Sequence, residues 1–334
     1  DRRQRQMCIR DRYILIGIFV LVVFIYNNNF LSFDSIVNIT MQSAARLIMA
    51  LGIAGAIVLT GTDLSAGRCV GLCACICASL LQSSGVMNKM FPSLAYSVWL
   101  IPIGLLISMA VGGLVGAFNG FMVSKFKLHP FIVTLGTQLI LYGMVMWYVS
   151  LGQNNSAPIA GLDQTYIDFI KGGFKIGGVQ IPNYLWITVA VTIVMWIIWN
   201  KTKLGKNMFA AGTNQEAAAV SGVNVAKTII LVFALAGITY GISGFVESAR
   251  IASNSTATGV NYELDAIAAC VIGGVSFMGG IGKIRGVILG VFLLQIVNAG
   301  LVFLEFNPAA QTIVKGAIIL FACAMDMRKY IAKK

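Results

Sequence analysis

The chain has 334 residues, of which 58% are hydrophobic and only 11% are charged, and its formal net charge is +12. Several apolar runs approach the twenty residues that a helix needs to cross the hydrocarbon core of a bilayer. This composition excludes a soluble globular protein and indicates an integral membrane protein. The 36 glycines agree with this class, because small residues let helices pack closely in lipid.

The apolar runs predict an all-α, polytopic membrane protein with about ten transmembrane or half-membrane helices. We expect these helices at residues 13–26, 44–60, 69–85, 94–124, 130–150, 184–200, 228–247, 264–282, 286–305 and 311–327. Residues 13–334 are expected to form a single transmembrane domain. Residues 1–12, DRRQRQMCIRDR, resemble translated sequencing-adapter sequence, so we expect them to be an artefact.

The basic residues alternate between the two sides of these segments. With the N-terminus inside, the outside loops carry only Lys89, Lys171, Lys175 and Arg250, and Arg46 and Lys315 stay unassigned. The other eighteen, which include Arg68, fall inside. This asymmetry predicts cytoplasmic N- and C-termini and explains the net charge by orientation in the membrane, without a nucleic-acid partner.

The stretch GTDLSAGR, residues 61–68, places polar residues between two apolar segments. Its core TDLSA resembles YELDA at residues 262–266, and both lead into Gly- and Ala-rich apolar runs. Transport proteins often consist of two structural repeats with broken helices. We therefore expect two pseudo-repeats, each with one broken helix.

Charged groups in a membrane are costly, so those near the two breaks are functional candidates. The residues that we expect to line a translocation path or a broken helix are Asp63, Ser65, Arg68, Glu263 and Asp265. The alternative is that they cap the broken helices or pair with one another. For Glu247 and Arg250, three residues apart, a plain ion pair is favoured.

The loop at residues 201–227 contains the signature of a short helix. Asn214 suits the N-cap, Glu216 the first turn and Gly222 the stop, with Ala217–Val220 between them. Such a helix has about two turns and needs a neighbour to be stable. From spacing alone, a docking element and an ordinary linker remain open.

Other constellations indicate packing rather than chemistry. Three cysteines at helical spacing, Cys69, Cys73 and Cys77, have no histidine nearby, so we expect no metal site. The glycines at 112, 116 and 120 and at 282, 286 and 290 predict close helix crossings. GGIGK at residues 279–283 lacks the first glycine and the Ser/Thr of a phosphate loop, so no nucleotide site is expected.

Three segments carry a family resemblance that extends from about Asn38 to the C-terminus. They are GTDLSAGRCVGL, GKNMFAAGTNQEAAAVSGVNV and YELDAIAACVIGGVSFMGGIG. They resemble the sugar permeases of bacterial ABC importers, most of all those for galactose and methyl galactoside, then those for ribose and other monosaccharides. The Cys-rich run after Arg68 departs from the motif.

The resemblance implies a non-catalytic permease of the bacterial inner membrane that works by alternating access. Its implied partners are a second copy of the chain, ATPase subunits that bind ATP and Mg²⁺, an extracytoplasmic sugar-binding protein and membrane lipid. No cofactor is expected in this chain. The residues implied to couple it to the ATPase are Asn214, Glu216, Ala217, Ala218, Ser221 and Gly222.

Two alternatives remain from the sequence. A permease for ribose or another monosaccharide would share all these features. An ion-coupled secondary sugar transporter would also have broken helices but would need its own ion site and no ATPase. A membrane enzyme ranks last, because it needs titratable groups clustered at one depth.

Overall fold

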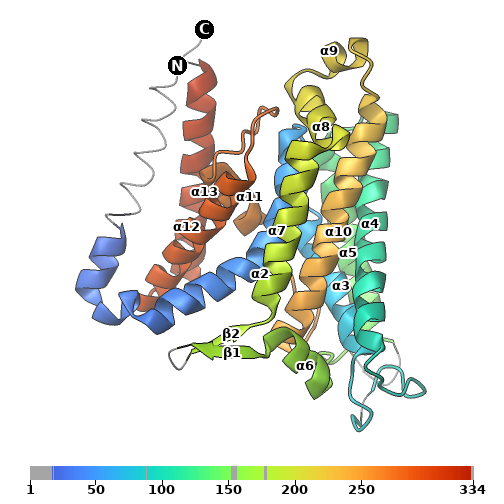
Figure 1. The fold of residues 1–334 in the computed structure, drawn as a ribbon, viewed down its shortest axis with the longest axis vertical. Helices are drawn as coiled ribbons and strands as arrows, with labels where there is room; N and C mark the ends of the chain where they lie inside the picture. The colour runs from blue at the N-terminus through green and yellow to red at the C-terminus, as the bar shows by residue number, and fades with distance from the viewer. Residues whose placement is uncertain (1–16, 18, 88, 152–155, 177–178, 332–334) are drawn as a thin grey trace.

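The computed structural model describes residue 17 and residues 19–331, apart from 88, 152–155 and 177–178. The described chain is almost entirely helical, with one short hairpin (Figure 1). Residues 1–12 lie outside the described part. The elements are η1 (Asn28–Leu31), α2 (Phe33–Val58), α3 (Ala66–Leu80), α4 (Leu100–Phe126), α5 (Pro130–Val149), α6 (Gln164–Lys171), β1 (Gly173–Ile176), β2 (Val179–Pro182), α7 (Tyr184–Lys201), α8 (Lys203–Thr213), α9 (Gln215–Val220), α10 (Val225–Ile251), α11 (Tyr262–Ile272), α12 (Ile284–Phe303) and α13 (Pro308–Ile331).

Six of these helices are long and apolar enough to cross a membrane: α2, α4, α5, α7, α10 and α12. Helices α3 and α11 are apolar but shorter, with 15 and 11 residues. The short hairpin pairs Gly173 with Pro182 in antiparallel register at the end of the molecule opposite α9 (Figure 1). The all-α polytopic fold predicted from the sequence is therefore confirmed.

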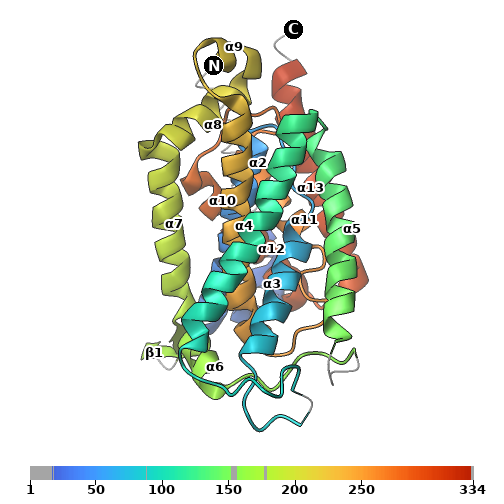
Figure 2. The same ribbon diagram turned by 90° about the vertical axis from the view of Figure 1, so that its right-hand side faces the viewer.

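Helix α10 lies at the centre and packs against α2, α3 and α4 (Figure 2). Glycines make its contact with α4 possible, because a Cβ on Gly112 or Gly116 would collide with the carbonyl oxygens of Gly237 and Phe233. Gly286 of α12 faces α11 in the same way. The predicted close crossings are confirmed, except that Gly282 lies in the loop before α12.

Two helix breaks organise the chain. Helix α2 runs toward the end that carries α9, and after the break at residues 59–65 helix α3 runs back (Figures 1 and 2). Helix α10 runs away from that end, and after residues 252–261 helix α11 returns toward it. The pairs α4 and α12, and α5 and α13, also run in opposite directions, which is the order of directions that inverted repeats have.

The structure corrects several predicted boundaries. Helix α2 begins at Phe33 and not at residue 44, because the Ser32 hydroxyl caps it and accepts a hydrogen bond from the Ser35 N–H. Helix α11 ends at Ile272 and not at residue 282, since Gly274 takes a positive φ of 86°. The predicted loops at 151–183 and 201–227 contain α6, the hairpin and α8.

Candidate functional site

Asp63 lies in the first helix break and is fully buried. Its Oδ1 accepts hydrogen bonds from the Ser65 N–H at 2.9 Å and from the Ser65 hydroxyl at 2.6 Å. Its Oδ2 accepts a bond from the Tyr240 hydroxyl of α10 at 3.1 Å. The carboxylate thus shapes the turn that opens α3 and ties it to the central helix.

The same network reaches two further helices. Asn119 of α4 donates from Nδ2 to the Ser65 hydroxyl at 2.9 Å, and its Oδ1 accepts a bond from the Thr137 hydroxyl of α5 at 2.6 Å. Asn119 and Ser65 are fully buried. Because buried polar groups are costly unless they are paired, these bonds fix one arrangement of α3, α4, α5 and α10.

Glu263 lies where the two broken helices meet. It belongs to the first turn of α11, and its Oε2 rests against Gly67 in the first turn of α3, where a Cβ would collide with it. The side chain is only 3% exposed, and Gln138 donates to Oε1 at 3.4 Å. One carboxylate therefore lies at the N-terminal ends of two helices, and its Oε2 has no hydrogen-bond partner within the described part of the chain.

Arg68 follows Gly67 on α3 and completes this junction. Its Nη1 donates to the Thr256 carbonyl at 2.8 Å, and its guanidinium lies 4.3 Å from the centre of the Tyr142 ring. Thr256 belongs to the link between α10 and α11, which is also tied to Ile159 through Asn254. The prediction that Arg68 lies in a cytoplasmic loop is therefore wrong, because the broken helix carries it into the interior.

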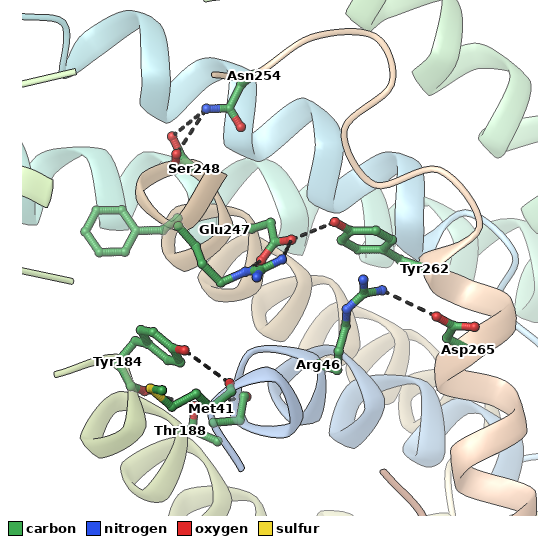
Figure 3. Close-up of polar contacts among 12 residues, drawn as sticks. Met41, Arg46, Tyr184, Thr188, Glu247, Ser248, Asn254, Tyr262 and Asp265 are labelled. Carbon is green, nitrogen blue, oxygen red and sulfur yellow. Dashed lines mark hydrogen bonds and ion pairs between the residues drawn. The ribbon is translucent and has the colours of Figure 1, made fainter. Parts of the chain in front are cut away.

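A second group of charges lies beside α11 (Figure 3). Arg250 forms a two-point ion pair with Glu247 at 2.6 and 2.7 Å, and the Tyr262 hydroxyl also donates to Glu247 at 2.6 Å. The guanidinium of Arg46 lies 3.6 Å from the centre of the Tyr262 ring. The predicted Glu247–Arg250 pair is confirmed, with Tyr262 as an added partner.

Asp265 binds two cations, Arg46 of α2 at 3.6 Å and Lys315 of α13 at 3.4 Å (Figure 3 shows the first). These are the two basic residues that the charge pattern left unassigned. The three side chains are 18–30% exposed, so this group lies closer to the surface than Asp63 does. Asp265 thus joins three helices that are far apart in sequence.

The five predicted path residues therefore fall into three places. Asp63 and Ser65 belong to the buried network, Arg68 and Glu263 to the junction, and Asp265 to the ion group beside α11. Tyr240, Asn119 and Arg46 were missed as partners. A usable signal existed, since each is a polar residue inside an otherwise apolar helix.

The short helix α9 forms as the sequence predicts. The Asn214 side chain accepts a hydrogen bond from the Ala217 N–H at 2.9 Å, and Gly222 ends the helix with a φ of 84°. The Ser221 hydroxyl donates to the Ala217 carbonyl, and Ala218 is the buried anchor. Glu216 is exposed and Val220 is 91% exposed at one tip of the molecule (Figure 1).

The cysteines of α3 are buried packing residues. Cys77 Sγ and the Ser108 hydroxyl of α4 lie 2.6 Å apart, and Cys73 Sγ donates to the Ser108 carbonyl at 3.6 Å. Among the described residues, no group of three His, Cys, Asp or Glu side chains is placed to hold a metal ion.

Comparisons with known proteins agree with these motifs. Residues 35–323 match the family described as branched-chain amino acid transport system / permease component. The galactose/methyl galactoside import permease protein MglC of Escherichia coli K12 is 43% identical over 96% of this chain and 95% of its own length. The MglC of Treponema pallidum is 37% identical over 96% of this chain and 62% of its own length. The ribose import permease protein RbsC of E. coli K12 is 33% identical over 94% of this chain and 93% of its own length.

No solved structure matches the chain with significance. The family match nevertheless covers most of the chain, including both helix breaks and α9. The helical fold, the inverted repeats and the sequence motifs all fit a membrane transport component. The chain therefore belongs to this family of transport-system permeases.

Proposed function

We propose that this chain is the transmembrane permease subunit of an ATP-driven importer that moves galactose or methyl galactoside into the bacterial cytoplasm. The observation that carries this proposal is 43% identity to a galactose/methyl galactoside permease over nearly the whole of both chains. The family description names branched-chain amino acids, but the similar relatives named above are sugar permeases.

The assembly that we propose has two copies of this chain, ATPase subunits and an extracytoplasmic sugar-binding protein. The ATPase docks on α9, whose exposed Glu216 and Val220 project from one tip of the molecule. Both chain termini and α9 then face the cytoplasm, and the hairpin and α6 face the binding protein. ATP and Mg²⁺ belong to the ATPase, and this chain catalyses no reaction.

In this mechanism, ATP binding moves the two copies of α9 together and the membrane helices rock between outward and inward states. The junction at Glu263 and Gly67 is where α3 and α11 separate or rejoin, because no covalent link crosses it. Asp63, Ser65, Arg68 and Asp265 are all held by protein partners. They support the path by positioning helices, and sugar selection falls mainly to the binding protein.

The test is uptake of labelled galactose into proteoliposomes that contain the permease, with the ATPase, the binding protein and internal ATP each present or omitted. Uptake is expected only in the complete mixture. Uptake by this chain alone under an ion gradient would contradict the proposal and favour a secondary transporter.

Ribose is the second candidate, because RbsC is 33% identical over nearly the whole chain. Competition between unlabelled ribose and labelled galactose in the complete mixture separates the two sugars. The binding protein can be exchanged in this mixture while the permease stays the same. Uptake of ribose, and not of galactose, with the cognate binding protein would reject the galactose proposal while keeping the importer.

A further inference from the structure

The segment that joins α11 to α12, residues 273–283, is rich in glycine and includes GGIGK, which the sequence excludes as a nucleotide site. It folds back on itself, since the Ser276 N–H donates to the Ile281 carbonyl at 3.0 Å and the Gly279 N–H to the Ser276 carbonyl at 3.1 Å. Gly279 and Gly280 take positive φ values of 79° and 67°, which residues with a side chain rarely adopt. The segment is therefore a compact loop whose shape depends on two glycines.

This loop packs against the end of α2, just before the first helix break. The Gly280 N–H donates to the carbonyl of Val58, the last residue of α2, at 2.8 Å. A Cβ on Gly279 would collide with the Thr60 methyl group. A Cβ on Gly282 would come within 2.8 Å of a Val58 methyl group. The loop that follows α11 thus touches the chain that enters the first break, with no room for a further side chain.

The end of α8 occupies the same place. Gly212 is buried, and a Cβ on it would collide with the Val58 carbonyl oxygen and lie 2.9 Å from the Gly280 nitrogen. A Cβ on Gly280 would in turn collide with the Thr213 hydroxyl. Asn214, which caps α9, follows directly. Three segments therefore meet at the level of their backbones beside α9. We call Gly212, Gly279, Gly280 and Val58 the glycine contact.

No side chain separates the backbones in the glycine contact, so none can rotate to absorb a shift. Close-packed protein interiors have low compressibility and transmit strain. A displacement of α9 therefore reaches Val58 and Gly280 through α8. From Val58 the chain continues to Asp63 in the first break, and from the loop it leads back to Ile272 at the end of α11. One contact beside α9 thus joins both broken helices.

We propose that the glycine contact moves as one body with α9 and carries its displacement to the end of α2 and the end of α11. This rests on the proposed function, because the ATPase moves α9 only in an ATP-driven importer. Gly212, Gly279 and Gly280 are then positioning residues for transport. They make both broken helices respond together to ATP binding.

The first test is Gly212→Ala, which forces a methyl group into the contact. Its matched control is Gly143→Ala on α5, where no atom lies within 4 Å of the Cβ position. The complete importer in proteoliposomes gives the number of galactose molecules imported per ATP hydrolysed. We expect this ratio to fall roughly tenfold for Gly212→Ala while ATP hydrolysis continues, because the surface of α9 is unchanged. The control should leave both quantities as they are in the wild type.

A purely structural role would lower uptake, ATP hydrolysis and the thermal unfolding temperature together, with the ratio unchanged, and that result would overturn the proposal. The wild-type importer in the same vesicles tests the proposed function separately. No uptake by the wild type would reject the importer itself. Uptake by the wild type, with the same ratio in Gly212→Ala, would reject only the role of the glycine contact.

The second test keeps the contact and locks it. Val58→Cys/Gly282→Cys brings two cysteines within reach of a disulfide, because a Cβ on Gly282 lies 2.8 Å from a Val58 methyl position. Cys8 and Cys323 are replaced first. If the contact moves as one body, the oxidised importer keeps its uptake. Loss of uptake on oxidation that dithiothreitol reverses, or failure of the pair to crosslink, would contradict the proposal.

Discussion

At the scale of single residues, the Asp63 carboxylate accepts three hydrogen bonds and is fully buried. We expect Asp63→Ala to destabilise the protein, because the hydroxyls of Ser65 and Tyr240 lose an acceptor, at about 1–3 kcal/mol for each buried group left unpaired. The measurement is the thermal unfolding temperature in detergent, with exposed Asp34→Ala as the control.

The same variant separates structure from sugar recognition. If Asp63 only positions helices, the surviving Asp63→Ala transporter keeps its order of preference among competing sugars. A clean change of that preference would contradict the positioning role.

Asp265 should behave differently, because its partners Arg46 and Lys315 are partly exposed. Exposed ion pairs contribute little, so Asp265→Asn should cost only about 1 kcal/mol or less. Adding Arg46→Gln should recover part of the loss, since it removes one of the two cations left unpaired. Unfolding temperatures of the two single variants and the double variant measure this coupling; strictly additive losses would argue against the contact.

At this scale the sequence predicted the acidic residues but not their partners. Asp63, Glu263 and Asp265 stand out because carboxylates are rare in apolar segments. Their partners come from helices up to 219 positions away in the chain, as Arg46 does for Asp265. Such pairings depend on how the helices pack, which a single sequence does not specify.

At the scale of elements, the junction of α3 and α11 depends on a residue without a side chain. Gly67→Ala should destabilise the protein by about 1–3 kcal/mol and reduce uptake, because the new methyl group collides with Glu263 and the Gly259 carbonyl. Gly136→Ala on α5 is the matched control, since no atom lies within 4 Å of its Cβ position. Equal effects of the two changes on unfolding and uptake would refute the close contact.

Helix α9 gives a second prediction at this scale. Glu216→Lys should abolish uptake in the complete importer, because it reverses an exposed charge on the proposed ATPase contact and opposes the helix dipole. Sugar affinity of the binding protein should not change. Glu305→Lys, an equal reversal of an exposed charge just after the end of α12, should leave uptake intact. Normal uptake with Glu216→Lys would remove the coupling role.

The sequence predicted α9 well and α8 not at all. Helix α9 has local signals, since an Asn cap and a Gly stop act within one turn. Helix α8 instead depends on docking against α7, where Gly205 meets the carbonyls of Trp199 and Ile198. Its apolar residues are too few and too spaced to resemble a span.

At the scale of the whole molecule, the proposed orientation puts the two ends of the helix bundle on opposite sides of the membrane. Lys127 lies at the end of α4 on the side of α9, while Lys175 lies on the hairpin at the far end (Figure 1). A single cysteine at position 127 should react with an impermeant maleimide only from the cytoplasmic side. A single cysteine at position 175 should react only from the outer side. Cys8 and Cys323 are replaced first; the other five cysteines are buried. Labelling of both sites from one side would contradict the proposed topology.

The inverted repeats explain why the molecule needs both breaks. Each half contributes one short helix that begins in the interior, and the two beginnings meet at Glu263 and Gly67. The five-residue likeness between TDLSA and YELDA indicated this relation. It did not indicate that the halves run in opposite directions, because their relative direction depends on how many times the chain crosses the membrane between them.

Helix α3 also bears on how the chain enters the membrane during synthesis. At 15 residues it is about 22 Å long, shorter than the hydrocarbon core, so it is a poor substrate for insertion as an independent span. Its main neighbour, α10, is translated about 150 residues later. Until α10 arrives, the polar turn of Asp63 lacks its Tyr240 partner. The packing of the first half is therefore completed only after α10 has been translated.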